Sequence, residues 1–328
     1  MPDDVGVQRK MVAILRVLVD ASEPVGAQRI GAQLQQQGLE LSERAIRYHL
    51  KTMDERGLTE GGKAGRVITE KGRAEFANAL VSDKVGFVVA KIDQLAYRTT
   101  FDLDTGSGDV IVNVSLLPTE HFEHALRVML PAFEAGFCMS DLVAVAHAGE
   151  ELGGVVPEEG MTAIATVCSV TINGVLLRNR IPVESRFGGL LEIRDGRPLR
   201  FVELVSYAGS SLDPLEIFIT SGLTDVREAG TSGSGKVGAS FREIPSVSLP
   251  HAMELIERMK GYHLNGVIAV GDPSQPLLEI SVPLDRVGIV VVGGLTPTAA
   301  LVEGDVPVTN KAMATALDFK RLQPVWNL

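Results

Sequence analysis

A short basic segment near the N-terminus carries side chains that suit contact with a nucleic-acid duplex. Its candidate contact residues are Ser42, Arg44, Arg47, Tyr48 and Lys51. Arginine can form two hydrogen bonds with a guanine edge, whereas lysine and tyrosine typically reach phosphate oxygens. At helical spacing these side chains lie largely on one side, opposite the apolar residues of the same segment. The pattern predicts a helix that enters a DNA major groove.

Three helices and a hairpin are needed to position that surface. Apolar spacing predicts helices over residues 11–19 and 27–37, and Ser42 is a good N-cap for a third helix that ends before Gly57. The expected buried side of the third helix consists of Ala45, Ile46, Leu50 and Met53. This amphipathic arrangement leaves the basic side of the helix in solvent.

The next residues predict the wing of a winged helix-turn-helix. Residues 58–68 read as a hairpin with a glycine-rich tip, on which Lys63 and Arg66 could contact the DNA backbone or a minor groove, and residues 70–80 are helical again. The segment LSERAIRYHLKTMDERGL, followed by GRVITEKG, resembles the winged-helix module of many prokaryotic regulators and of some ribonucleases. A winged helix that binds RNA or another protein is the alternative.

Composition limits the class of protein. The chain has 328 residues, enough for two or three domains. Residues 1–80 hold 12 Lys and Arg against 11 Asp and Glu, whereas the remainder holds 19 against 30, which points to separate partners. The overall acidity excludes a wholesale polyanion binder. Two cysteines, no apolar run of membrane-spanning length and no apolar signal core predict a cytoplasmic protein without a membrane partner.

From about residue 82 the pattern changes to alternating strands and helices. The predicted strands are 85–92, 110–116, 142–148, 164–171, 239–244, 266–270 and 287–292. The predicted helices are 120–135, 214–220 and 250–260, with a further helix beginning at Thr296-Pro297. Asp195-Gly196 predicts a two-residue hairpin turn. The expected fold class is therefore α+β or α/β, with a winged helix-turn-helix over 1–81 and an α/β domain over 82–328.

The second region contains one pattern twice. A Leu-Pro pair, a helix, two apolar strands and a Pro-Val segment follow in the same order in both halves. The pair Leu249-Pro250 lies 132 residues after Leu117-Pro118, whereas the strand and Pro-Val matches lie 125 residues apart. The match reflects either a duplication or a chance likeness of αβ units. A duplication predicts lobes of about 82–206 and 207–328, with a cleft that suits a small ligand.

Several long motifs resemble one known family. They are SDLV, TVCSVTINGVLL, RIPV, RFGGLLEI, SSLDPLEIF, FREIP and VGIVVVGGLTP. These strings are similar to the NrpR regulatory domain over about residues 82–315. The resemblance implies a homodimeric repressor of nitrogen-assimilation genes, or a higher even oligomer, that leaves its double-stranded DNA operator when 2-oxoglutarate binds. Many members carry two regulatory domains, whereas this sequence has one.

A keto-diacid effector needs cations or several N–H donors for its carboxylates. Residues near the motifs with suitable groups are Cys168, Thr171, Asn173, Arg178, Ser185, Arg186, Thr220 and Arg242. We take Cys168, Thr171, Asn173, Arg178, Arg186 and Arg242 as the predicted effector site. Each has a plainer interpretation: a buried core cysteine, a turn at Asn173-Gly174, or dispersed surface arginines.

Other motifs do not support an enzyme. Gly230–Val237 is nearly a phosphate-binding P-loop, but Val237 stands where Ser or Thr must hold Mg²⁺, and a flexible loop explains its composition. His121 and His124 share a helix side without an evident third metal ligand. We therefore expect no catalytic site, no metal and no cofactor. The alternative function is an enzyme that acts on a small acid in the cleft between the lobes, with an accessory winged helix.

Overall fold

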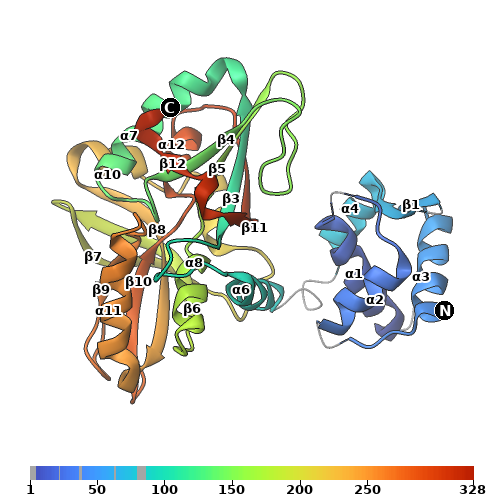
Figure 1. Cartoon of the computed structure of the whole chain (residues 1–328), viewed down its shortest axis with the longest axis horizontal. Coiled ribbons are helices and arrows are strands. Elements are labelled where there is room, and N and C mark those ends of the chain that lie inside the picture. Colours follow the sequence, from blue (N-terminus) through green and yellow to red (C-terminus); the bar gives the residue numbers. More distant parts are fainter. Residues whose placement is uncertain (1–4, 22, 37–38, 63, 80–85) are drawn as a thin grey trace. The chain divides into compact units, whose positions relative to one another are not determined.

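The chain divides into two compact units, residues 1–85 and 86–328. The computed structural model describes residues 5–21, 23–36, 39–62, 64–79 and 86–328 (Figure 1). This division lies within a few residues of the boundary expected from the change in sequence pattern. Each unit has its own apolar core and is described separately below.

The first unit is a winged helix. Its elements are α1 (Val5–Val19), α2 (Ala27–Gln36), α3 (Glu43–Glu55), β1 (Thr59–Gly62), β2 (Gly65–Ile68) and α4 (Glu70–Asn78). Ile14, Ile30 and Ile46, one from each of the first three helices, are fully buried against one another. β1 pairs antiparallel with β2, and Val25 forms a short bridge to Arg66. The predicted order of helices and wing is confirmed.

The second unit contains the same series of elements twice. It begins with α6 (Phe87–Arg98). The first series is β3 (Asp109–Pro118), η1 (Thr119–His121), α7 (Phe122–Glu134), β4 (Leu142–Ala146), β5 (Met161–Val167), α8 (Val170–Arg178) and β6 (Glu184–Arg194). The second series is β8 (Gly235–Pro245), η2 (Ser246–Ser248), α11 (Leu249–Lys260), β9 (Val267–Val270), β10 (Arg286–Val292), α12 (Thr296–Glu303) and β11 (Thr309–Asp318). We call these repeat 1 and repeat 2.

Shorter elements join and follow the repeats. β7 (Arg197–Ser206), α9 (Pro214–Thr220) and α10 (Val226–Ser232) lie between them in the chain, and η3 (Phe319–Arg321), β12 (Gln323–Pro324) and η4 (Val325–Asn327) come after repeat 2. Asp195 and Gly196 form the predicted hairpin turn between β6 and β7, both at positive φ.

The two repeats exchange their last strands. One antiparallel sheet has the order β7-β6-β8-β10-β9, and the other has the order β11-β3-β5-β4-β12. β6 of repeat 1 therefore lies beside the first strand of repeat 2, and β11 of repeat 2 lies beside the first strand of repeat 1. Neither repeat completes a sheet with its own strands.

The backbone path of the repeats matches even where the residue types differ. In repeat 1, left-handed positions are occupied by Gly136, Gly149, Gly153, Gly154 and Gly160. The equivalent left-handed residues of repeat 2 are His263, Ser274, Leu278, Glu279 and Asp285. A residue with a Cβ atom is disfavoured in this conformation by roughly 1–2 kcal/mol. Repeat 2 has therefore kept the backbone conformation while losing the residue that adopts it without strain.

Helices cover both sheets. α8 and α11 share a core with strands of both repeats, including Val114, Ile172, Leu255 and Val291. α7, α10 and α12 pack together elsewhere in the unit (Figure 1). α6 packs on α8 and places Val88 and Ile92 over the start of α8. The β5–α8 turn is therefore enclosed by helix and sheet.

One predicted strand is a helix, and another ends earlier than expected. Residues 87–98 form α6, because Val88, Ile92, Leu95 and Ala96 recur at helical spacing and are buried. The strand predicted over 164–171 ends at Val167, and α8 follows. α8 is buried from Val170 to Leu176, so it has no polar side that could indicate its helical period.

Three other expectations need correction. Pro118 corresponds to Pro245, since each ends a strand before a 3₁₀ turn, so Leu249-Pro250 was the wrong match. The sheets do not divide near residue 206, because β6 and β7 join the strands of repeat 2. The P-loop-like segment is not simply a loop: it forms the end of α10 and the start of β8.

The paired left-handed positions give a stability test. Replacing Gly154 by Ala should lower the free energy of unfolding by about 1 kcal/mol, because φ is +75° and the new Cβ meets no atom within 4 Å, so only backbone strain is added. Replacing Glu279 by Gly at the equivalent site, where φ is 67°, should cost less than about 0.5 kcal/mol, since released strain offsets the entropy of glycine. Urea denaturation measures both. Equal losses would contradict the strain explanation.

Candidate functional site

The exposed side of α3 presents the predicted DNA contacts. The side chains of Arg47 and Lys51 are 72% and 79% exposed, and Tyr48 is 68% exposed. Arg47 is paired with Glu43, and Lys51 lies 3.8 Å from Glu55, but such exposed pairs contribute little and can yield to phosphates. Exposed Arg44 makes no ion pair or hydrogen bond within the described residues. Its guanidinium is available for a partner without breaking any contact.

Capping fixes where α3 begins. The Ser42 hydroxyl oxygen accepts a hydrogen bond from the amide of Ala45 at 3.2 Å, as predicted for an N-cap. Ser42 is exposed, but this bond already uses its oxygen as an acceptor. The predicted contact Lys63 lies outside the described residues, so its role stays a prediction.

Arg66 has a different role from the one predicted. Its Nε donates to Asp54 Oδ2 at 2.8 Å, its Nη1 donates to the carbonyl of Gly62, and its side chain is only 27% exposed. Asp54 also accepts from the Thr59 hydroxyl at 2.7 Å. Arg66 therefore fastens the wing to α3 instead of extending toward a duplex.

The buried side of α3 includes a histidine that the sequence analysis missed. Ile46, His49, Leu50 and Met53 are buried, whereas Ala45 is only half-buried. Burial, followed by the charge of Lys10, lowers the pKa of His49, and its Nδ1 has no hydrogen-bond partner. The spacing from Ile46 to Met53 was the available signal, because it places residue 49 on the inner side.

The second unit contains a buried pocket where the two repeats meet. We call it the Arg242 pocket. Its lining is Ile92, Asn113, Cys168, Ser169, Val170, Ser185, Tyr207, Asp213, Leu215, Arg242, Gly294, Leu295 and Met313. Equivalent turns contribute from both repeats: Ser169 precedes α8, and Gly294 precedes α12. Met313 lies in a bulge of β11 at positive φ, where the Asn113 side-chain oxygen accepts its amide hydrogen bond.

Arg242 is a buried cation whose hydrogen bonding is incomplete. It is 2% exposed, and its two Nη groups donate to the carbonyl and hydroxyl oxygens of Ser169 at 2.7 and 2.8 Å. Its Nε–H has no hydrogen-bond partner in the described part of the chain. Burial lowers the pKa of Arg242, while the charges of Tyr207, Cys168 and Asp213 oppose that shift. An unpartnered buried N–H on a guanidinium favours an anionic ligand.

Backbone dipoles add to this preference. The N-termini of α8 and α12 both border the pocket, and the partial positive charge of a helix N-terminus favours anions. The fold itself does not require arginine at position 242. Its equivalent in repeat 1 is Ser115. In the strand register, Ser115 lies opposite Asn310 of the exchanged strand β11, and Arg242 lies opposite Ser185 of the exchanged strand β6. The arginine is thus specific to one repeat.

Burial shifts the pKa values of the neighbouring titratable groups in the direction that favours their neutral forms. Burial raises the pKa of Cys168 to about 11, which excludes a reactive thiolate, and raises that of Tyr207 well above 10. Burial also raises the pKa of Asp213, although its side chain caps α9 by accepting from the amide of Leu215. The pocket therefore combines one strong cation with weakly ionised neighbours.

The pocket is narrow. Its volume is about 20 Å³, which is room for roughly one water molecule. A ligand of several carbon atoms would need a neighbouring wall to move.

Comparison with known proteins decides the family. The family model described as NrpR regulatory domains NRD1 and 2 matches residues 85–324, and the model of the ribonuclease R winged-helix domain matches residues 12–76. A curated relative, global nitrogen regulator NrpRI of Methanosarcina mazei, is 36% identical over 98% of this chain and 99% of its own length. The chain belongs to the NrpR family.

Other NrpR proteins differ in length. The global nitrogen regulators NrpR of Methanococcus maripaludis and Methanocaldococcus jannaschii are 33% and 32% identical over 87% and 96% of this chain, which spans 50% and 54% of their lengths. A solved structure of a nitrogen repressor-like protein from Methanococcus jannaschii has a TM-score of 0.61 and 30% identity, covering 73% of this chain and 98% of that one. These matches confirm the predicted family resemblance.

The predicted effector residues of this NrpR chain separate into two groups. Cys168 and Arg242 line the pocket, and Asn173 lies next to it, donating to the Ser185 hydroxyl at 3.0 Å while its own Oδ1 is buried without a partner. Thr171 is buried, and its hydroxyl bonds the backbone of Ile111. Three of the six predicted residues therefore lie at or beside the pocket, and their role in effector binding stays a prediction.

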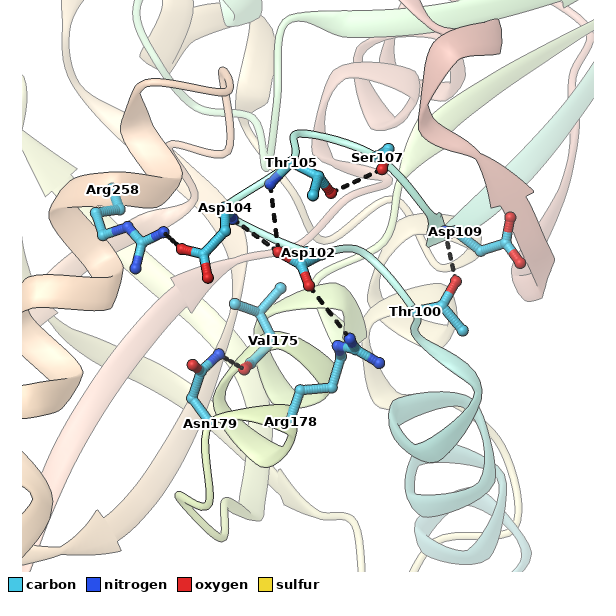
Figure 2. Close-up of polar contacts among 10 residues, drawn as sticks. All are labelled: Thr100, Asp102, Asp104, Thr105, Ser107, Asp109, Val175, Arg178, Asn179 and Arg258. Carbon is cyan, nitrogen blue, oxygen red and sulfur yellow. Dashed lines mark hydrogen bonds and ion pairs between the residues drawn. The ribbon is translucent and has the colours of Figure 1, made fainter.

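The other two arginines are engaged elsewhere. Arg178 lies 3.6 Å from Asp102. Asp102 belongs to the same loop as Asp104, which pairs with Arg258 (Figure 2). Half-buried Arg186 bonds Glu184 at 2.7 Å and lies 3.5 Å from the buried carboxylate of Glu243. The expected assignment of Thr171, Arg178 and Arg186 to the ligand site is not supported by their positions.

Several pocket residues had no signal in the sequence. Tyr207 and Asp213 lie between the repeats, and α6 was read as a strand, so nothing linked Ile92 to this region. Gly294 and Leu295 could have been found, since they lie 125 residues after Ser169 and Val170, which is the spacing of the duplication. No group of three or more metal-ligating side chains occurs in the described part of the chain. No described helix is long and apolar enough to cross a bilayer.

Asp213 gives a pH-dependent test of the pocket. Because its pKa is raised in the folded state, the native protein loses stability as pH rises above the ordinary aspartate value near 3.9. Asn is as good an N-cap, so Asp213→Asn should stabilise the protein at pH 7 by about 1 kcal/mol or less, and the gain should shrink toward pH 4. Thermal denaturation across pH measures it. Exposed Asp272→Asn is the control, and a gain that does not vary with pH would contradict this cause.

Proposed function

We propose that this chain is a repressor of nitrogen-assimilation genes and that 2-oxoglutarate, bound in the Arg242 pocket, controls its affinity for a DNA operator. Membership of the NrpR family supports a regulator of nitrogen-related genes, and the exposed basic side of α3 supports DNA as its partner. The observation that carries the effector assignment is the unpartnered Nε–H of Arg242 between two helix N-termini. A carboxylate fits a guanidinium with free N–H groups that lies beside two such dipoles.

The DNA-binding part of the proposal uses α3 as the recognition helix. Arg44 and Arg47 are spaced by one helical turn and can reach base edges, while Tyr48 and Lys51 suit phosphate contacts. Arg66 holds the wing against α3 through Asp54, so it acts as a positioning residue. A homodimer would present two such helices to half-sites in successive major grooves.

The narrow pocket gives the effector a mechanism. A cavity of about 20 Å³ does not hold a ten-atom diacid, so the ligand must select a conformation in which the walls have moved. Such a ligand shifts the population toward the open form by its difference in affinity for the two forms. A coupling of about 1–3 kcal/mol would change operator affinity roughly 5- to 150-fold.

The DNA-binding proposal predicts which arginine matters most. Arg44→Ala should weaken binding to an operator selected from random duplexes by about 10- to 100-fold, since a base-contacting arginine contributes about 1–3 kcal/mol. Arg47→Ala should have a smaller effect, because Arg47 must break its hydrogen bond with Glu43 before it can contact DNA. Fluorescence anisotropy measures the affinity, and calorimetry with 2-oxoglutarate should be unchanged for both.

The matched control is Arg73→Ala, an exposed arginine of α4 outside the proposed surface. If it weakens binding as much as Arg44→Ala, the contribution of α3 is only general positive charge. If no duplex is selected with or without 2-oxoglutarate, the repressor proposal is wrong, and the enzyme and interaction-module alternatives come forward.

A further inference from the structure

A diacid needs more than Arg242. Each Nη group of this arginine already donates one N–H to Ser169, and the Nε–H has no partner among the described residues. The free N–H groups belong to one guanidinium, whose single positive charge can balance one carboxylate. A second carboxylate brought into the same buried region without a cation would carry a large desolvation cost. The pocket must therefore recruit another positive group or reject diacids.

Lys91 is a second cation whose charge acts on the groups that line the pocket. Its charge, like that of Arg242, lowers the pKa of both Cys168 and Asp213, which line the pocket. It immediately precedes Ile92, the pocket-lining residue of α6. The half-buried Lys91 ammonium makes one long hydrogen bond, 3.4 Å to the carbonyl of Ala312. Ala312 lies next to Met313, another lining residue.

We infer that Lys91 binds the second carboxylate of the effector and thereby makes the pocket selective for dicarboxylates. This inference rests on the proposed function, since it names a specificity residue of the same pocket. The long contact to Ala312 is easily exchanged for a charge-assisted bond to a carboxylate, which is shorter and stronger. Asp213 and Glu216 are the acidic groups nearby, and the Lys91 charge lowers the pKa of each while burial raises it.

The position of Lys91 connects binding to the rest of the chain. α6 is the first element of the second unit, and it begins at Phe87, directly after the unit that contains α3. A ligand that draws Lys91 away from Ala312 and displaces Ile92 shifts α6. The side chain that selects the ligand therefore also moves the first helix of the second unit.

The test compares a diacid with a matched monoacid. Full-length protein is titrated by calorimetry with 2-oxoglutarate and with 2-oxopentanoate, which replaces the distal carboxylate by a methyl group. Lys91→Met should weaken 2-oxoglutarate binding by about 10- to 100-fold and leave 2-oxopentanoate binding unchanged, because only the distal charge loses its partner. Lys91→Arg should restore most of the preference. Exposed Lys260→Met, on α11, should behave as wild type.

The outcomes are distinguishable. Equal weakening of both ligands by Lys91→Met would mean that Lys91 only supports the fold of α6, and an undiminished preference for the diacid would place the second cation elsewhere. Either result overturns the role of Lys91 while the proposed function stands. If the wild-type protein binds neither compound, the effector assignment of the proposed function fails together with this inference.

Discussion

The exchange of β6 and β11 between the repeats is the constraint on which the second unit depends. Each strand supplies the missing edge partner of the first strand in the other repeat, so both sheets form only when both repeats are present. The exchange also fixes the β5–α8 and β10–α12 turns beside each other, which brings two helix N-termini to one place. The anion preference of the pocket follows from this topology before any charged side chain is considered.

Arg242 turns that symmetric meeting point into an asymmetric site. The equivalent residue in repeat 1 is Ser115, which is buried and bonded to Asn310 at 2.6 Å, so the fold can be satisfied by neutral groups. The guanidinium bonds Ser169, but its unused Nε–H costs desolvation energy that no contact among the described residues offsets. Its presence in one repeat alone is the physical reason to assign it to a ligand, and Lys91 extends the same asymmetry to α6.

The sequence was most informative where elements are amphipathic. The helices of the first unit and the exposed side of α3 could be predicted because each has one apolar and one polar side. α8 could not, since near-complete burial hides its helical period. α6 has apolar residues at helical spacing, but its β-branched residues also favour a strand. Arg242 differs from Arg178 and Arg186 in being buried, and the sequence alone does not show this difference. Tyr207 and Asp213 reach the pocket only through tertiary structure, so no local spacing identifies them.

The left-handed residues of repeat 2 bear on the history of this fold. Five glycine positions of repeat 1 are held in the same conformation by His263, Ser274, Leu278, Glu279 and Asp285. Surrounding packing therefore determines the course of the main chain strongly enough for the two repeats to differ in composition at their bends. Searches for repeats in similar proteins should compare backbone torsion angles, because the sign of φ is shared even where only one repeat has glycine.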